Sequence, residues 1–516
     1  MGSELLGDER VDEGNDTGEP PDDQDIRQYG GESEAAPGEA GEGRGEDSGI
    51  SNLAGVLATT VDHFFPDFNA RLRRIKDPRD PEMITYNLET LFWQGLLTLI
   101  TKQGSRLKIS RHMRADFFLK NLRQFSGQQK LETAPHGDTL EYLFRKLTVK
   151  DVEQFLVDCV DQLLRGRVFE GSRLTVYNTD GGRDKYYMIA IDGVHLYSFD
   201  YEHCPGCLVK EDSSTGKKTW MHHKLQASLV TPGGFCIPLA SEWIENEKVY
   251  VKQDCELKAF YRLIKKIRKF FPRLEICVLL DGLYAAQPVF AALKAVDMEY
   301  IAVLKAGSMP EVWAWKSLME KHPGVRKSFV EEETKTIPAR RRRTHQNRLV
   351  RQKPRHETRE AVTTARYEWI KEFRHWDGER VFNILGCHET EDGKDLYHCT
   401  WIVSDKLNVC ERNVKPLSKG GRVRWTIENE GHNVQKNGGY GLEHQYSRDE
   451  NSMKIWNVLL DIAHMINQLI EKGSLIVREV YGTLRDLAQR LFEHLRYFVF
   501  EKPLTRPRIQ IRFNTS

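Results

Sequence analysis

Apolar positions repeat with helical spacing over residues 51–170. Leu53 and Val56 open one amphipathic segment, and Val152 and Phe155 belong to another. A recurrence every three to four residues places these side chains on one face of a helix. This part of the chain therefore predicts a helical domain.

The pattern then changes, and short apolar runs replace the helical stripe. One run ends at Asp192, and the continuous run Ile276–Leu280 ends at Asp281, as expected for strands that are buried on both faces. Between the two runs, apolar residues spaced three and four apart predict a helix that Pro272 ends. Residues 186–305 thus predict strand, strand, strand, helix, strand, helix, strand, which is an α/β core.

Further strand-like segments and a run of basic residues interrupt this core over residues 306–400. A polar helix follows Gly420 and Gly421. Two more helices are predicted after it, one with a strong apolar stripe over 452–471 and a last one over about 477–498.

Charge is distributed unevenly along the 516 residues, although the formal net charge is only +1. Residues 1–49 hold sixteen acidic and three basic side chains and almost no large apolar group, so burial cannot offset their ordering entropy and a disordered tail is expected. The remaining residues carry 73 basic and 59 acidic side chains, which points to a polyanionic partner. Basic stretches in the helical domain suggest DNA contact there, with an ordinary solvated face as the alternative.

These patterns divide the chain into six segments. The predicted order is an acidic tail over 1–49, a helical N-terminal domain over 50–174, the first part of the α/β core over 175–305, a basic β-rich insertion over 306–400, the second part of the core over 401–472, and a C-terminal helix with a basic tail over 473–516.

The nine cysteines are scattered and form no disulfide framework. Apolar stretches such as Leu91–Ile100 fall short of the ~18 residues that a membrane span needs. No charged and then apolar signal peptide opens the sequence. A cytoplasmic protein is expected.

Candidate chemistry lies at the two strand ends. A carboxylate at the end of a buried strand is costly unless something pairs with it, and hard oxygen ligands suit Mg²⁺ or Mn²⁺. Taken singly, Asp192 and Asp281 are more typical of turn or helix caps. Arg424 and Glu428 add a third carboxylate, one helical turn from an arginine that can orient it or hold a DNA phosphate.

In combination, these segments resemble the DDE transposases of bacterial insertion sequences, specifically the insertion-sequence-four-type group. The resemblance covers roughly residues 85–472. The matching segments are Ala190–Gly193, Leu279–Tyr284, Arg424–Glu428, Asn437–His444 and the helix that contains Ile462–His464.

The resemblance implies an RNase H-like core with Asp192, Asp281 and Glu428 as catalytic residues and metal ligands. It implies two Mg²⁺ or Mn²⁺ ions, cleavage of DNA at the terminal inverted repeats of an element, and strand transfer into target DNA. The partners would be these DNA segments and a second copy of the chain, and the expected setting is a prokaryotic cytoplasm with association to the nucleoid.

Two positions depart from the family's fuller signature. Its Tyr three residues before the Arg is Gly421 here, and its Lys seven residues after the Glu is Gln435, with Lys436 one step further. On a regular α-helix Gln435 shares the face of Glu428, and Lys436 lies about 80° round it. We expect Lys436 to reach a DNA phosphate nevertheless, and Glu428 rather than Glu430 to act as the third carboxylate.

The insertion offers further candidates for DNA contact. Arg340, Arg341, Arg342 and Arg343 are consecutive, and counterion release on DNA binding would give their mutual repulsion a purpose. A solvated loop is the alternative. Trp313 and Trp315 are typical of packing residues, but the resemblance implies that Trp313 stacks on a flipped base.

Cys204 and Cys207 have the spacing of a zinc knuckle, with His203, His222 and His223 nearby. Because a structural Zn²⁺ needs four ligands and only one CxxC is visible, an ordinary turn is favoured and Zn²⁺ is the minority interpretation.

Two other functions compete with transposition. One is a transposase-derived DNA-binding protein without catalysis, which the presence of all three carboxylates argues against. The other is a nuclease that shares the core but performs no strand transfer.

Overall fold

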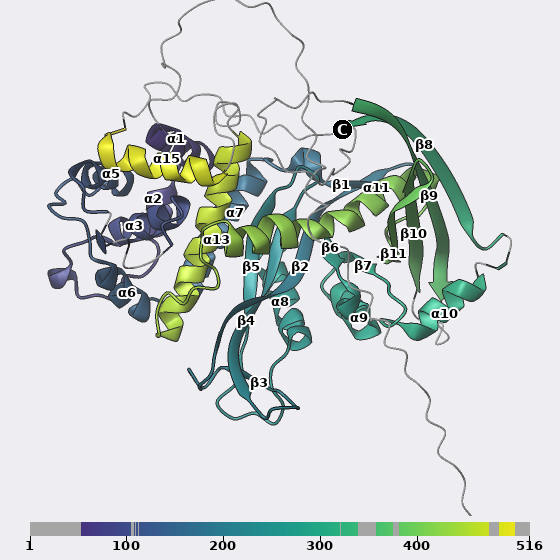
Figure 1. Ribbon diagram of the computed structural model, residues 1–516, viewed down its shortest axis with the longest axis horizontal. Coiled ribbons are helices and arrows are strands. Elements are labelled where there is room, and N and C mark those ends of the chain that lie inside the picture. The colour runs from purple at the N-terminus through teal and green to yellow at the C-terminus, as the bar shows by residue number, and fades with distance from the viewer. Residues whose placement is uncertain are drawn as a thin grey trace, which may run out of the picture. The chain divides into compact units, whose positions relative to one another are not determined.

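The mixed sheet that organises the chain is drawn in Figure 1, a computed structural model. The structure describes residues 53–473 and 484–500, apart from 105–107, 109, 112, 320, 323, 339–357 and 375–380. The acidic tail, Arg340–Arg343 and the basic C-terminal residues lie outside the described part of the chain. Everything described below belongs to the unit Asn52–Ser516.

The N-terminal helices pack on a long helix from near the other end of the chain. They are α1 (Leu53–Phe64), α2 (Phe68–Leu72), α3 (Leu88–Ile100), α5 (Asp116–Ser126), α6 (Gly137–Lys146) and α7 (Val149–Arg165). All thirteen residues of α3 are buried, because α13 (Glu450–Gly473) packs against it and α2, α5 and α6 cover its other sides. Helix α15 (Leu484–Tyr497) lies against α1 and α5.

A sheet of eleven strands follows in the chain. The first strands are β1 (Leu174–Tyr177), β2 (Arg183–Phe199), β3 (Leu208–Glu211), β4 (Lys218–Val230) and β5 (Cys236–Ile244). Helix α8 (Glu256–Phe270) then leads to β6 (Ile276–Leu280), and α9 (Gln287–Ala295) leads to β7 (Glu299–Val303). Strands β5, β4 and β2 are antiparallel neighbours, and β6 and β7 continue the sheet parallel to β2.

The strands of the predicted insertion extend this same sheet. They follow α10 (Pro310–Met319) and are β8 (Lys327–Pro338), β9 (Thr358–Arg374), β10 (Val381–Glu391) and β11 (Lys394–Ser404). Strand β11 pairs antiparallel with β7 of the core. Because β11 runs from residue 394 to residue 404, the boundary predicted at residue 400 between the insertion and the second part of the core falls inside one strand. The α/β class predicted from the sequence is confirmed at this level.

A buried apolar core joins the two parts of the sheet under helix α11 (Glu411–Arg422). Trp401 of β11 is fully buried there. A Cβ on Gly421 would lie 2.7 Å from the Trp401 indole nitrogen, so the helix has no room for a side chain at this position. This contact gives a physical reason for the glycine at position 421, where the transposase family that the sequence resembles has a tyrosine.

None of the helices in the described residues has the length and apolar character that crossing a lipid bilayer requires.

Candidate active site

Two aspartates occupy equivalent positions along neighbouring parallel strands, with Asp192 within β2 and Asp281 directly after β6. Ala190 of β2 is in register with Leu279 of β6, and Asp192 and Asp281 each follow two residues later. The Asp281 side chain caps a short turn by accepting a hydrogen bond from the Leu283 amide at 2.9 Å. The sequence predicted a strand that ends at Asp192, but β2 continues to Phe199, so Asp192 projects from within a long strand.

Glu428 comes from a different part of the chain and is held by Arg424. The Arg424 guanidinium donates to Glu428 Oε1 at 2.7 Å, and only 6% of the Arg424 side chain is exposed. Burial raises the pKa of Glu428 above its usual value, Arg424 opposes that rise, and the nearby charge of Asp192 adds to it. Arg424 therefore orients the glutamate here. Its predicted contact with DNA remains a prediction.

The helix that carries Glu428 is not a regular α-helix. Ile427–Asn433 is π-helical, and a short α-helical turn, α12 (Val434–Asn437), follows it. A π-helical turn takes in an extra residue, which changes the faces on which later residues lie. Gln435 is consequently buried against α13, where it donates to Asp461 at 2.9 Å. The expectation that Gln435 shares the face of Glu428 assumed regular α-helical geometry, which this segment does not have, and it stays a prediction.

His432 and Lys436 follow Glu428 at intervals of four residues along this helix. His432 Nδ1 lies 3.5 Å from Asp192 Oδ2, and its Nε2 is buried without a hydrogen-bond partner among the described residues. Lys436 lies 3.0 Å from Glu443, and after burial its charge is the next cause that lowers the pKa of His195 on β2. The sequence did not single out His432, because its contact with Asp192 forms only when the helix packs against β2.

A fourth carboxylate, Glu256, joins the two aspartates. It lies in the first turn of α8, and a Cβ built on Gly193 would lie 2.7 Å from its Oε2. Tyr284 donates a hydrogen bond to Glu256 Oε1 at 2.5 Å. Burial raises the pKa of Glu256, the Tyr284 hydrogen bond opposes this, and the charges of Asp192 and Asp281 add to the rise. Sequence reasoning missed Glu256, since an acidic first-turn residue is common in any helix.

These carboxylates do not form one compact ligand set. Within the described ranges, at least three ligand atoms from His, Cys, Asp or Glu lie within 4.8 Å of one another only at His203, Cys204, Cys207 and His222. Metal coordination by Asp192, Asp281 and Glu428 therefore stays a prediction. Glu430, the rival third carboxylate, is exposed.

A buried polar network supports the helix of Glu428 from the side of α13. Asp461 accepts hydrogen bonds from Gln226 of β4 at 3.2 Å and from Gln435. The Lys224 ammonium lies 3.2 Å from the other Asp461 oxygen, and both side chains are almost fully buried. Because Gln226 is paired in register with Asp192, this network connects α13 and α12 to the strand beside the candidate site.

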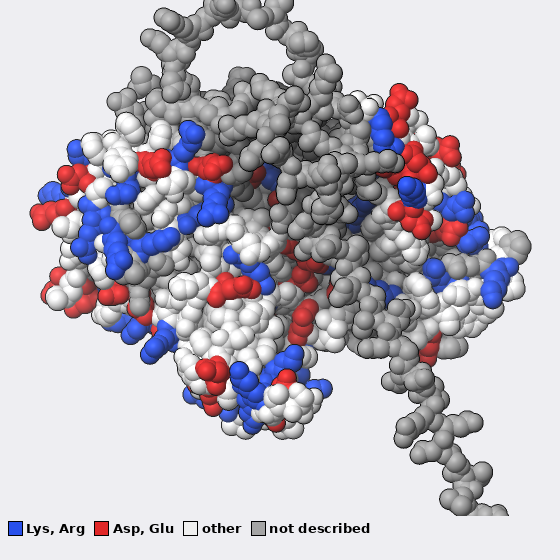
Figure 2. Space-filling view, viewed as in Figure 1, with Lys and Arg blue, Asp and Glu red and all other residues white. Residues whose placement is uncertain are grey.

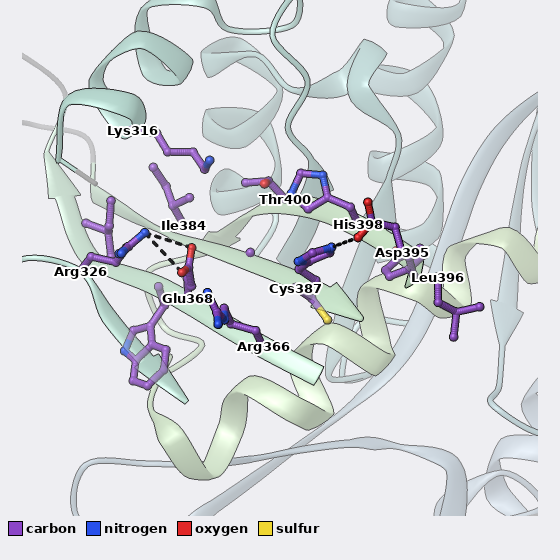
Figure 3. A pocket seen from close by; sticks show the side chains of 15 residues that line it. Lys316, Arg326, Arg366, Glu368, Ile384, Cys387, Asp395, Leu396, His398 and Thr400 are labelled. Atoms are coloured by element: carbon purple, nitrogen blue, oxygen red, sulfur yellow. Dashed lines mark hydrogen bonds and ion pairs between the residues drawn. The ribbon is translucent and has the colours of Figure 1, made fainter. Parts of the chain in front are cut away.

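The insertion carries a separate hollow of about 660 Å³ on strands β9, β10 and β11. Figure 3 shows Arg326 paired with Glu368 across it, with Lys316, Arg366 and His398 also on its lining. The Lys316 ammonium lies 4.9 Å from the centre of the half-buried Trp313 ring, which places that tryptophan beside the hollow. Stacking of Trp313 on a base stays a prediction, and Arg340–Arg343 lie outside the described residues.

Basic side chains are spread over several parts of the surface. Figure 2 shows lysine and arginine over the N-terminal helices and on the ribbon of β3 and β4. Acidic side chains are interspersed with them in this view.

Comparisons with known proteins give little further information. No family model matches the chain, and no curated protein matches it. Among solved structures, it is similar to the piggyBac transposase in a synaptic complex with hairpin DNA, at 10% sequence identity and a TM-score of 0.37. The match covers 87% of this chain and 80% of that one. At this level of similarity, function has to be inferred from the residues of the chain itself.

Proposed function

We propose that the chain is a DDE-type transposase that cleaves DNA strands at the ends of an insertion sequence and joins them to target DNA. One observation carries the proposal. Asp192 in β2 and Asp281 directly after β6 follow paired residues of two adjacent parallel strands, and the buried Arg424 holds Glu428 near enough to Asp192 for their charges to interact.

The strand order supports the RNase H-like form of the core. Three antiparallel strands in the order β5, β4, β2 are followed by two strands parallel to β2, with α8 and α9 as the connections. Such an arrangement places Asp192, where the pairing of β2 with β6 ends, beside the carboxyl end of β6, and ligands bind at the carboxyl ends of strands in open α/β sheets. Asp281 lies at that edge of the sheet, and Asp192 lies beside it.

The donor set fits Mg²⁺ or Mn²⁺. Asp192, Asp281 and Glu428 would hold the ions through carboxylate oxygens, which hard divalent cations prefer. When bound, the ions activate the attacking hydroxyl and stabilise the leaving oxygen of the phosphodiester. Arg424 fixes the orientation of Glu428, and Glu256 adds negative charge that favours a cation at the two aspartates.

DNA binding would depend on basic residues around this edge. Lys436 continues the row that starts at Arg424 and is placed to contact a phosphate once it leaves Glu443. Trp313 and Arg340–Arg343, from the insertion, would also contact DNA. Cleaving two element ends implies two copies of the chain in the active complex.

The test compares two glutamates of the same helix. Glu428→Gln keeps the size of the side chain and removes its charge, and Glu430→Gln does the same at an exposed position two residues away. In Mg²⁺, with DNA that carries the sequences flanking the gene, Glu428→Gln should lose strand cleavage by at least about 1,000-fold. Glu430→Gln should cleave normally. Equal cleavage by the wild type and by Glu428→Gln would overturn the proposal.

A nuclease without strand transfer is the second candidate. The observation that favours it is the close contact of Gly421 with Trp401, which excludes a side chain where the resembling family has a tyrosine. A joining assay with cleaved element ends and a target plasmid separates the two. Covalent joining supports the transposase, and cleavage without joining supports the nuclease.

A further inference from the structure

Four potential metal ligands gather where the ribbon of β2, β3 and β4 turns back. His203, Cys204 and Cys207 come from the loop between β2 and β3, and His222 comes from β4. Ligand atoms of all four lie within 4.8 Å of one another. This ribbon carries the labels β3 and β4 in Figure 1.

The distances in this cluster match the edges of a tetrahedral zinc site. The two sulfurs are 3.6 Å apart, and His222 Nε2 lies 3.5 Å from Cys204 Sγ and 3.2 Å from Cys207 Sγ. Zinc bonds of ~2.3 Å to sulfur and ~2.0 Å to nitrogen would give edges of about 3.8 Å between sulfurs and about 3.5 Å between sulfur and nitrogen. The side chains therefore need only small shifts to hold one ion.

One ligand candidate has an unsatisfied nitrogen that the other contacts do not explain. His203 Nδ1 is buried and has no hydrogen-bond partner in the described part of the chain. Its Nε2 lies 2.7 Å from the side-chain amide of Gln445. That contact is to the amide nitrogen of Gln445, which donates to Nε2. With a metal on Nδ1, the proton would reside on Nε2, and the Gln445 amide would turn over so that its oxygen accepts it, as an outer partner typical of metal-ligating histidines.

The protein also holds the cysteine loop in place. The Cys204 amide donates to Cys207 Sγ at 3.4 Å, and the Cys207 amide donates to the Cys204 carbonyl at 3.2 Å. Asn246, which follows β5, donates to the carbonyls of Cys207 and Gly206. A loop held by its own backbone and by Asn246 is pre-organised for a ligand.

We propose that His203, Cys204, Cys207 and His222 bind one structural Zn²⁺. Two thiolates and two imidazoles form a closed four-ligand set, which leaves no position for substrate and so indicates a structural ion. The ion would join the β2–β3 loop to β4 and, through Gln445, to the segment before α13. The sequence favoured an ordinary turn because only one CxxC was visible, and the pairing of β4 with β2 brings His222 rather than His223 to the two cysteines.

The test measures metal directly in the purified full-length chain. Protein expressed with zinc in the medium and purified without chelators should contain about one zinc per chain by elemental analysis. Cys204→Ser should lose most of it. Cys410→Ser is the matched control: Cys410 precedes α11 as its N-cap, where serine is favoured, and it is outside the cluster, so zinc should be retained.

A second measurement does not depend on the variants folding. Wild-type protein stripped of zinc and reloaded with Co²⁺ should give the intense visible absorption of tetrahedral cobalt with thiolate ligands, and added Zn²⁺ should abolish it. Zinc-free wild type that takes up no Co²⁺ would overturn the proposal.

Discussion

Two acidic regions near β2 differ in how their negative charge is compensated. Asp461 is buried, but it is matched by the Lys224 ammonium and by two amide donors, Gln226 and Gln435. The acidic edge, defined as Asp192, Glu256, Asp281 and Glu428, holds four carboxylates: Arg424 pairs with Glu428, Tyr284 donates to Glu256, and His432 lies 3.5 Å from Asp192. Burial is the main cause that raises the pKa of Glu256 and of Glu428; repulsion from the neighbouring aspartates adds to the rise, and Tyr284 and Arg424 oppose it.

This difference distinguishes a carboxylate that supports the fold from carboxylates that serve a function. A buried charge that only supports the fold is paired, because an unpaired one costs several kcal/mol. Uncompensated charges persist where something outside the chain completes the site, and perturbed carboxyl pKa values in such a place indicate function. Removing one charge should therefore have opposite effects on stability in the two groups.

The largest effect is expected from Asp281→Asn at the acidic edge. Asn Oδ1 can still accept the Leu283 amide, so the turn is kept while the charge that would hold a metal is lost. Strand cleavage and joining in Mg²⁺ should fall by at least about 1,000-fold, or about 4 kcal/mol of transition-state stabilisation. DNA affinity, measured by fluorescence anisotropy, should be unchanged, and thermal stability equal or slightly higher. Near-normal cleavage would remove Asp281 from the catalytic set.

The matched change in the buried network is Asp461→Asn, which should destabilise the protein. Lys224 would keep its charge with no carboxylate beside it, at a cost of about 3–5 kcal/mol. The free energy of unfolding from urea denaturation measures this. The double variant Lys224→Met with Asp461→Leu should recover most of the loss, because no charge is left unpaired. If Asp461→Asn is as stable as wild type, the contrast between the two groups is wrong.

A smaller effect with the opposite sign is expected from Glu256→Gln. Gln Oε1 can still accept the Tyr284 hydroxyl, while the repulsion with Asp192 and Asp281 disappears. The folded pKa of Glu256 is raised, so the native state binds more protons than the unfolded chain between the unfolded pKa of ~4.3 and the raised value. Wild-type stability should therefore decrease as pH rises through that window.

Glu256→Gln should consequently be more stable than wild type above the window, and this advantage should vanish below it. The gain is expected to stay under about 1 kcal/mol, because Glu256 is partly exposed and solvent screens the charge. Thermal unfolding in EDTA from pH 4 to pH 8 tests this, with exposed Glu247→Gln as the control. A gain that does not depend on pH would contradict the electrostatic cause.

The smallest effect concerns the basic residue beside the acidic edge. Lys436→Met should weaken DNA binding a few-fold at every sequence. The slope of the logarithm of the binding constant against the logarithm of the salt concentration should become shallower by about 1, as expected for the loss of one phosphate contact. Lys265→Met, at an exposed position on α8, is the control. Affinities measured across a salt series decide the matter, and an unchanged slope would leave Lys436 as the partner of Glu443 only.

Several elements of the fold and site could be predicted from sequence. The apolar run Ile276–Leu280 became β6, the stripe that Pro272 follows became α8, and the acidic residues at Asp192 and Asp281 drew attention to one edge of the sheet. These predictions succeeded because burial imposes a local period on each segment. The extent of β2 was missed, since its later part is a ribbon stabilised by β4 rather than an apolar run.

The sequence by itself determined many of the strands and helices, among them β6, α8 and α13, and which residue types could carry chemistry. Only the tertiary structure decided that Ile427–Asn433 is π-helical, that Gln435 is buried against Asp461, and that Glu256 joins the aspartates. It also decided that His222 lies beside Cys204 and Cys207. The physical reason is that periodicity reports the face a residue takes on its own element, whereas charge pairing and ligand sets depend on distances between elements that are remote in the chain.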